Sequence, residues 1–166
     1  MKKTLAILLT VLMAVMVFMP AVCANDQKEI GPTDEDIEIT QEEIEKLEHV
    51  TSEGSVRADL ISSYSLTLAK NGSQLVIVAK TIGISSVTKS GFTYIYLQRY
   101  VSGAWQNYAT YTNQYNDGPT HSFSKAVNAA TGYSYRVVCE HYAEKKTLLI
   151  FTSSQTIYNQ TASLSF

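Results

Sequence analysis

The chain has 166 residues, 45% of them hydrophobic, with a formal net charge of −2 and two cysteines. This length suits one domain with a tail. The Lys and Arg residues are dispersed rather than gathered in a basic stripe, which argues against nucleic-acid binding.

The first 24 residues have the pattern of a secretory signal peptide. The basic pair Lys2-Lys3 precedes an apolar run, Leu5–Met19, and small residues lead up to Ala24. We expect cleavage between Ala24 and Asn25, which leaves 142 residues. The expected location is secreted or cell-surface, without stable membrane insertion after cleavage.

Two other fates of this segment stay open. The apolar run could be retained as an anchor, although about 15 residues are fewer than the roughly 20 that span a bilayer. Cys23 could carry a lipid, although Pro20-Ala21-Val22 fits the usual lipobox poorly.

Cleavage removes Cys23 and leaves Cys139 without an internal partner. We expect Cys139 to be a small buried core residue; pairing with a second chain is the alternative.

Residues 25–57 are expected to form an acidic, largely disordered tail. Eleven of the 15 acids lie between Asn25 and Glu53, against two lysines, a net of −9, whereas residues 54–166 carry +5. Such a segment can bury little surface. One short helix is expected over 41–49, because Thr40 and Glu43 fit a capping box and Ile44 and Leu47 follow at helical spacing.

From residue 58 to 166 the pattern becomes that of a β domain. Apolar and polar residues alternate with period two, and turn signals such as Asn71-Gly72 and Ser102-Gly103 recur about every ten residues. This predicts an all-β fold, a sandwich of seven or eight strands. The expected strands are 60–70, 74–82, 92–101, 105–112, 121–127, 133–142 and 147–158.

The segment from Tyr133 to Cys139 resembles the F strand of immunoglobulin-like and fibronectin type III-like domains. In that strand a tyrosine hydroxyl bonds to backbone upstream, and the resemblance gives this part to Tyr133 or Tyr135. The disulfide of antibody domains is absent. The whole chain also resembles small exported proteins of Gram-positive bacteria whose function is unknown.

Alternation along the strands predicts the core. Trp105 is expected to pack over one edge of it. The other expected core residues are Leu66, Leu68, Leu75, Ile77, Ala79, Ile95, Leu97, Phe123, Val127, Tyr135, Val137, Leu149 and Phe151, with Val76, Val78 and Ile82 as the alternative face of their strand.

Tyrosine carries the expected function. All 11 Tyr residues lie between Tyr64 and Tyr158, and Tyr suits the recognition of sugars or peptides because it combines a rigid apolar ring with a polar hydroxyl. We therefore expect a non-enzymatic protein that binds a glycan or protein partner outside the cell or at its envelope, without a cofactor or metal. The expected binding residues are Tyr94, Tyr96, Tyr100, Tyr108, Tyr111 and Arg99.

Other classes of protein stay open. Cys139 and His141 share a strand face and, with His121, could form a metal or thiolate–imidazole site of a small secreted enzyme. A toxin-like secreted protein is a further alternative. No pair of carboxylates, phosphate loop or hydrolase motif supports catalysis.

Overall fold

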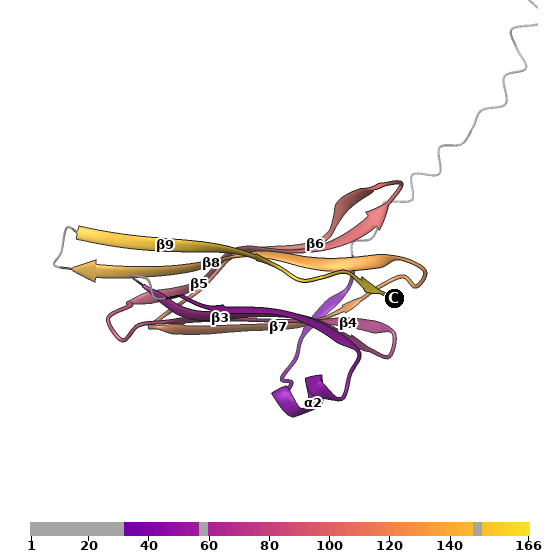
Figure 1. The fold of residues 1–166 in the computed structure, drawn as a ribbon, viewed down its shortest axis with the longest axis horizontal. Helices are drawn as coiled ribbons and strands as arrows, with labels where there is room; N and C mark the ends of the chain where they lie inside the picture. The colour runs from indigo at the N-terminus through magenta and orange to yellow at the C-terminus, as the bar shows by residue number, and fades with distance from the viewer. Residues whose placement is uncertain (1–31, 57–59, 148–150) are drawn as a thin grey trace, which may run out of the picture. The chain divides into compact units, whose positions relative to one another are not determined.

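The structure, a computed structural model, describes residues 32–56, 60–147 and 151–166. The predicted signal peptide, Cys23 and the cleavage site at Ala24 and Asn25 lie outside these residues. The described part is nearly all β and forms two antiparallel sheets, as the sequence predicts. Figure 1 shows β8 and β9 in one layer and β3, β4 and β7 in the other.

Sheet A has five strands in the order β1-β7-β4-β3-β2. Its centre is the hairpin of β3 and β4, which turns at Asn71-Gly72 as predicted, with Gly72 at a φ of 61°. The strand bounds are β1 Asp34–Asp36, β2 His49–Ser55, β3 Ile61–Asn71, β4 Gln74–Gly83 and β7 Thr120–Asn128.

Sheet B has the order β10-β8-β5-β6, and β9 pairs with the same edge of β8 as β10 does. The hairpin of β5 and β6 turns at Ser102-Gly103. The bounds are β5 Lys89–Val101, β6 Ala104–Asp117, β8 Ser134–Thr147, β9 Phe151–Gln160 and β10 Leu164–Ser165. The turn predicted at residues 144–146 is wrong, because β8 continues to Thr147.

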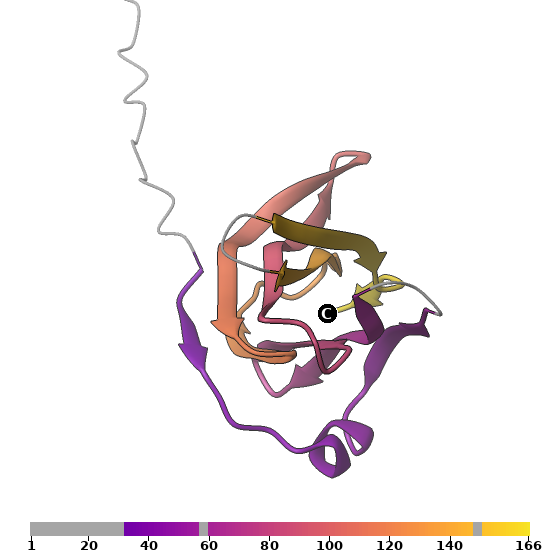
Figure 2. The ribbon, with the colours of Figure 1, turned by 90° about the vertical axis from the view of Figure 1, so that its left-hand side faces the viewer.

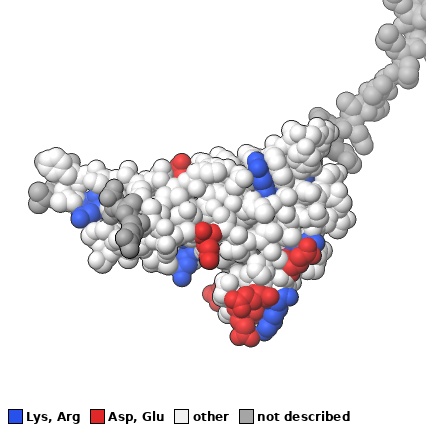
Figure 3. All heavy atoms as spheres, viewed as in Figure 1, with Lys and Arg blue, Asp and Glu red and all other residues white. Residues whose placement is uncertain are grey.

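Residues 32–56 differ from the expected disordered tail. They belong to the same compact unit as the sandwich, and β1 and β2 form the two edges of sheet A. Between them lies α2, Gln41–Glu45, whose Thr40–Glu43 capping box is confirmed. We call residues 32–48 the strap. Figure 2 shows that, after β1, it passes along the outside of sheet A to β2, and Figure 3 shows acidic side chains gathered over α2.

Apolar residues hold the strap on the outer face of sheet A. Ile37, Ile39 and Leu47 pack on a buried patch formed by Ala69, Val76 and Ala126, and Ile44 is 2% exposed. Two ion pairs add to this contact. Lys125 Nζ lies 3.1 Å from Asp36 Oδ1, and Lys70 Nζ lies 2.7 Å from Glu48 Oε2. The acidic side chains face solvent, so a highly charged segment still buries one apolar side.

The main core lies between the sheets and contains most of the predicted residues. Leu149 lies outside the described residues, and Phe151 is wrong as a core residue, because it is 63% exposed. The buried cluster is Leu66, Leu68, Leu75, Ile77, Ala79, Phe92, Ile95, Leu97, Phe123, Val127, Tyr135, Val137, Cys139 and Leu164.

No helix in the described ranges has the length and apolar character needed to cross a membrane.

Candidate functional site

The outer face of sheet B, the face turned away from the core, carries a series of aromatic side chains. Ile95 and Leu97 are buried in the core, so alternation along β5 puts Tyr94 and Tyr96 on the outer face. The strand register aligns this face into rows across the sheet. One row is Tyr158, Glu140, Tyr94 and Thr112, the next is Gln160, Val138, Tyr96 and Thr110, and a third has Arg136, Gln98 and Asn107.

Tyr94 and Tyr96 form a stacked pair at the centre of this face. Their ring centroids lie 4.6 Å apart and the ring planes differ by only 10°. Each ring covers one face of the other, and we call this stacked pair the Tyr94–Tyr96 ridge. Both residues are partly exposed, so the ridge is open to a partner on the outer face of the sheet.

A second aromatic group lies farther along the same face, near the β5–β6 turn. The rings of Tyr100 and Trp105 are 5.1 Å apart, and the guanidinium of Arg136 lies over the indole at 4.4 Å. Gln98 lies between this group and the Tyr94–Tyr96 ridge; it accepts a 2.9 Å hydrogen bond from Arg136 Nε and donates one of 2.9 Å to Asn107. Polar groups thus fill the sheet face between two aromatic groups.

The face extends from Tyr94 in two further directions. Sideways, in the Tyr94 row, Tyr158 lies two strands away on β9; it is 57% exposed, and its hydroxyl donates to Gln160. Toward the start of β5, the ring centroids of Tyr115 and Tyr142 lie 5.1 Å apart, and Lys89 lies over the Tyr115 ring. We use the name aromatic face for Tyr94, Tyr96, Tyr100, Trp105, Tyr115, Tyr142 and Tyr158 together.

Two tyrosines of this face, Tyr94 and Tyr142, have a raised pKa. Partial burial, with a smaller contribution from the Glu140 carboxylate, raises the pKa of Tyr94. Burial and the hydrogen bond to Glu144 raise the pKa of Tyr142 to about 12. These two hydroxyls therefore stay protonated at neutral pH and act as neutral donors and acceptors.

Three of the expected binding residues do not lie on this face. Tyr108 and Tyr111 pack against the main core instead: the Tyr108 ring meets Tyr135 and the Tyr111 ring meets Phe123. Arg99 lies over the rings of Tyr108 and Tyr133. Arg99 lies between Gln98 and Tyr100 on β5, so alternation puts it on the opposite face. A bulge in the β5–β6 ladder at Leu97/Gln98 switches the faces of the β6 side chains that follow it, which turns Tyr111, the partner of Ile95, toward the core.

Several residues of this face are not predicted from the sequence. Trp105 lies here rather than over the core edge. Tyr142 and Tyr158 were counted only as strand residues, and Arg136 was not singled out. Arg136 and Tyr142 lie an even number of residues apart on β8, so alternation predicts that they share a face of the sheet. Tyr158 joins that face only through the pairing of β9 with β8.

The resemblance to an F strand leaves open whether Tyr133 or Tyr135 bonds to backbone upstream, and in the structure Tyr135 does so. Its hydroxyl donates a 2.9 Å hydrogen bond to the Ala130 carbonyl, five residues earlier, and the residue is fully buried. Tyr133 is 39% exposed. Tyr135 thus closes the loop between β7 and β8.

Cys139 and His141 do come together, but inside the sandwich. Cys139 Sγ lies 3.2 Å from His141 Nε2, and both residues are fully buried. Thr81 donates to the Gly91 carbonyl and therefore accepts from His141 Nδ1, 2.9 Å away, which leaves Nε2 to accept from the thiol. Burial raises the pKa of Cys139 and lowers that of His141 to about 4, so both are neutral.

This buried pair does not suit nucleophilic or metal chemistry. The reactive forms, thiolate and accessible imidazole, are disfavoured by burial. His121 contacts the Phe92 ring, which lies against His141 as well. Within the described ranges, no group of three or more His, Cys, Asp or Glu side chains is placed to hold a metal ion.

Comparison with known proteins gives no relative: no family model, curated protein or solved structure matches this chain.

Proposed function

We propose that this protein is an exported, non-enzymatic binding protein that holds a neutral glycan chain of the cell envelope or surroundings on its aromatic face. The observation that carries the proposal is the Tyr94–Tyr96 ridge, a stacked and partly exposed pair of rings at the centre of a sheet face that carries further aromatic side chains. The C–H faces of a sugar ring are weakly positive and pack on the negative face of an aromatic ring.

The surroundings of the ridge favour a sugar over an apolar partner. Gln98, Asn107 and Gln160 supply amide groups beside the rings, and the flanking threonines of β6 supply hydroxyls. Amides and hydroxyls both donate and accept hydrogen bonds, as sugar hydroxyls require. The central part of the face has one cation, Arg136, and one anion, Glu140, which favours a neutral glycan over an anionic wall polymer.

The extent of the aromatic face favours a polymer. Tyr94 and Tyr100 are six residues apart on β5, which at about 3.3 Å per residue separates them by about 20 Å. A single sugar reaches only one of the aromatic groups, whereas a chain reaches both. Affinity is therefore expected to rise with chain length, because linked contacts reinforce each other.

We also infer that the sandwich is of the immunoglobulin-like type. Sheet B in the order β9-β8-β5-β6 corresponds to strands G, F, C and C′ of such domains, and β3, β4 and β7 correspond to A, B and E. The hydrogen bond from Tyr135 at the start of the F-like strand supports this inference. In such domains binding belongs to exposed faces and loops of a stable sandwich.

The test is binding of purified protein to a panel of soluble and insoluble cell-wall and plant polysaccharides. The variant Tyr94→Ala/Tyr96→Ala/Tyr100→Ala is expected to lose binding at least tenfold while it unfolds at the wild-type temperature. Phe151→Ala is the matched control, because Phe151 is 63% exposed and lies outside the aromatic face. Wild-type binding by a folded triple variant overturns the proposal, as does absence of binding to every glycan.

Export is tested separately. Cell fractionation with mass spectrometry of the mature N-terminus is expected to find an extracellular chain that begins at Asn25. A chain that keeps its first residues, or that carries lipid on Cys23, contradicts free secretion.

A further inference from the structure

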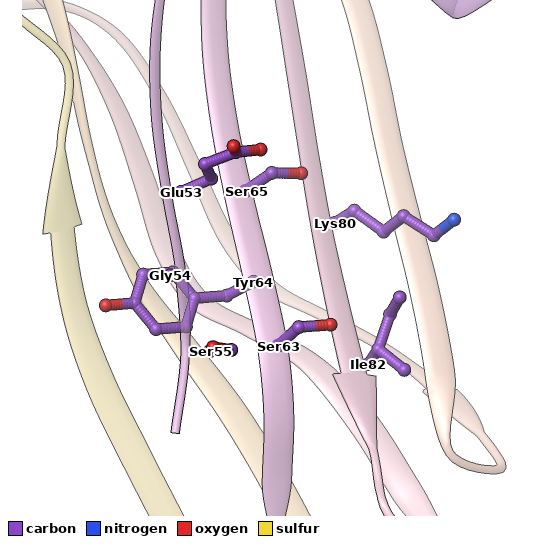
Figure 4. A pocket seen from close by; sticks show the side chains of 8 residues that line it. All are labelled: Glu53, Gly54, Ser55, Ser63, Tyr64, Ser65, Lys80 and Ile82. Atoms are coloured by element: carbon purple, nitrogen blue, oxygen red, sulfur yellow. The ribbon is translucent and has the colours of Figure 1, made fainter. Parts of the chain in front are cut away.

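A groove crosses the outer face of sheet A, on the side of the sandwich opposite the aromatic face. It has a volume of about 480 Å³ and is lined by β2, β3 and β4. Two rows of the strand register form its floor: Glu53, Ser65 and Lys80 in one row, and Ser55, Ser63 and Ile82 in the next. Figure 4 shows these side chains on neighbouring strands.

The groups in this groove have no partners of their own. Within the described part of the chain, Glu53 and Lys80 make no ion pair or hydrogen bond, and the hydroxyls of Ser55, Ser63 and Ser65 make no hydrogen bond. Glu53 and Lys80 are exposed, and the three serines are partly or fully exposed. An anion, a cation and three hydroxyls are therefore available to a ligand.

The spacing of the two charges sets the kind of ligand. Glu53 and Lys80 lie on strands separated by β3, so their Cα atoms are about 10 Å apart at the usual strand spacing. Two residues of extended peptide span about 7 Å, and their terminal ammonium and carboxylate lie at the two ends. The side chains of Glu53 and Lys80 can close the remaining distance.

We propose that this groove binds a short zwitterionic peptide in extended form. Glu53 holds its terminal ammonium, Lys80 holds its terminal carboxylate, and the serine hydroxyls meet the amide groups between them. Ile82 offers an apolar surface to a side chain of the ligand. The volume is in the range of small-molecule sites, and the floor is polar, so a dipeptide or tripeptide fits better than a lipid or a long chain.

The site does not depend on glycan binding, because it lies on the other sheet. It also differs from the rest of the sheet A outer face. There the strap covers the apolar patch of Ala69, Val76 and Ala126. The groove lies beyond this covered patch, where the sheet face carries three serine hydroxyls, Glu53 and Lys80 beside a single apolar side chain, Ile82.

The test is a titration of the isotope-labelled protein with dialanine, followed by amide chemical shifts. Shifts are expected to concentrate on β2, β3 and β4 around the groove. N-acetyl-dialanine lacks the ammonium and dialanine amide lacks the carboxylate. Each is expected to bind about two- to fivefold more weakly, the range of an exposed charge pair.

Two variants assign each end of the ligand. Glu53→Gln is expected to weaken dialanine binding and to remove the difference between dialanine and N-acetyl-dialanine. Lys80→Gln is expected to weaken dialanine binding and to remove the difference between dialanine and dialanine amide. Glu38→Gln and Lys145→Gln, at positions away from the groove, are the charge-matched controls and are expected to bind as the wild type does.

Two results overturn the proposal. One is that dialanine causes no saturable shifts at the groove. The other is that binding responds equally to acetylation in the wild type and in Glu53→Gln, which places the ammonium elsewhere. Either result leaves the glycan experiment unaffected, so the two proposals fail separately.

Discussion

The thiol of Cys139 lies 3.2 Å from Nε2 of His141, and this pair is sealed between the two sheets. His141 continues the contact to Thr81, and Thr81 to the Gly91 carbonyl, so that one chain of hydrogen bonds joins β8, β4 and β5. A satisfied buried polar network of this kind fixes the relative position of the strands that it joins. The pair thus has a structural role, and burying it lowers the free energy of unfolding by an amount that depends on pH.

The first prediction concerns this cost. Burial lowers the pKa of His141 to about 4, below the ordinary value of 6.5. Between pH 4 and 6.5 the His141 imidazole is therefore mostly protonated in the unfolded chain and mostly neutral in the folded chain. The free energy of unfolding therefore falls as the pH drops from 6.5 toward 4, by at most about 1.4 kcal/mol per pH unit. Between pH 7.5 and 4.5 the wild type is expected to lose about 2–3 kcal/mol more than His141→Gln.

Urea unfolding at the two pH values measures this difference. His121, whose pKa is also lowered by burial, contributes to both proteins and cancels. An equal pH dependence in the wild type and in His141→Gln contradicts the prediction.

The second prediction is that the Cys139 thiol is inert in the folded protein. It is fully buried, and burial raises its pKa, so thiolate is scarce and out of reach. In a Cys23→Ser background, Ellman's reagent is expected to label Cys139 only at the rate of unfolding. Rapid labelling without denaturant, with the fold intact by circular dichroism, contradicts this and returns the thiol to consideration as a reactive group.

The third prediction separates the two tyrosines at the start of β8. Tyr135→Phe removes the hydrogen bond to the Ala130 carbonyl and keeps the buried ring, so a loss of about 1 kcal/mol is expected. Tyr133→Phe, at a position that is 39% exposed, is expected to change stability by less than about 0.5 kcal/mol. Denaturant unfolding of both variants makes the comparison; equal losses argue against the role given to Tyr135.

The fourth prediction concerns the contact of Gly54 with Tyr64 across β2 and β3. A Cβ at Gly54 would lie 2.5 Å from Tyr64 Oη and 2.6 Å from its Cζ, so Gly54→Ala is expected to cost about 1–3 kcal/mol. In a Tyr64→Ala background the same substitution is expected to cost much less, because the ring is gone. A double-mutant cycle measures the coupling, and additive costs contradict the steric explanation.

The sequence predicts most of the two sheets because apolar residues alternate clearly along the strands. Leu66 and Leu68, and likewise Ile95 and Leu97, occupy the core as their spacing predicts. The Thr40 capping box follows from a short local pattern that needs no partner strand, and the resemblance to an F strand narrows the upstream-bonding tyrosine to Tyr133 or Tyr135. These features are local, so sequence alone contains them.

The missed features depend on contacts between distant segments. The bulge at Leu97/Gln98 turns Tyr111 toward the core, and no property of β6 alone indicates where its register with β5 shifts. The aromatic face joins β5 to β9 through β8, so Tyr158 becomes a neighbour of Tyr94 only in the folded sheet. The strap was misread because its charge outweighs its few apolar residues in composition, although those residues share one side.

The last prediction tests what holds the strap. Helix α2 has only five residues, too few to be stable alone, so its order must come from contacts with sheet A. Leu47 packs on sheet A, and Ile44 is 2% exposed, so Ile44→Ala is expected to destabilise the strap by about 2–4 kcal/mol. Because β1 has only three residues, the strap is expected to open locally before the sandwich unfolds.

Hydrogen exchange measures this opening by region. In Ile44→Ala, the amides of β1 and α2 are expected to lose protection while those of β5 and β8 keep nearly all of theirs. Ile84→Ala, at a position that is 39% exposed, is the control and is expected to leave both regions unchanged. If β1 and β8 lose protection together, the strap and the sandwich unfold as one unit, and the strap is then part of the core fold rather than a cover laid on it.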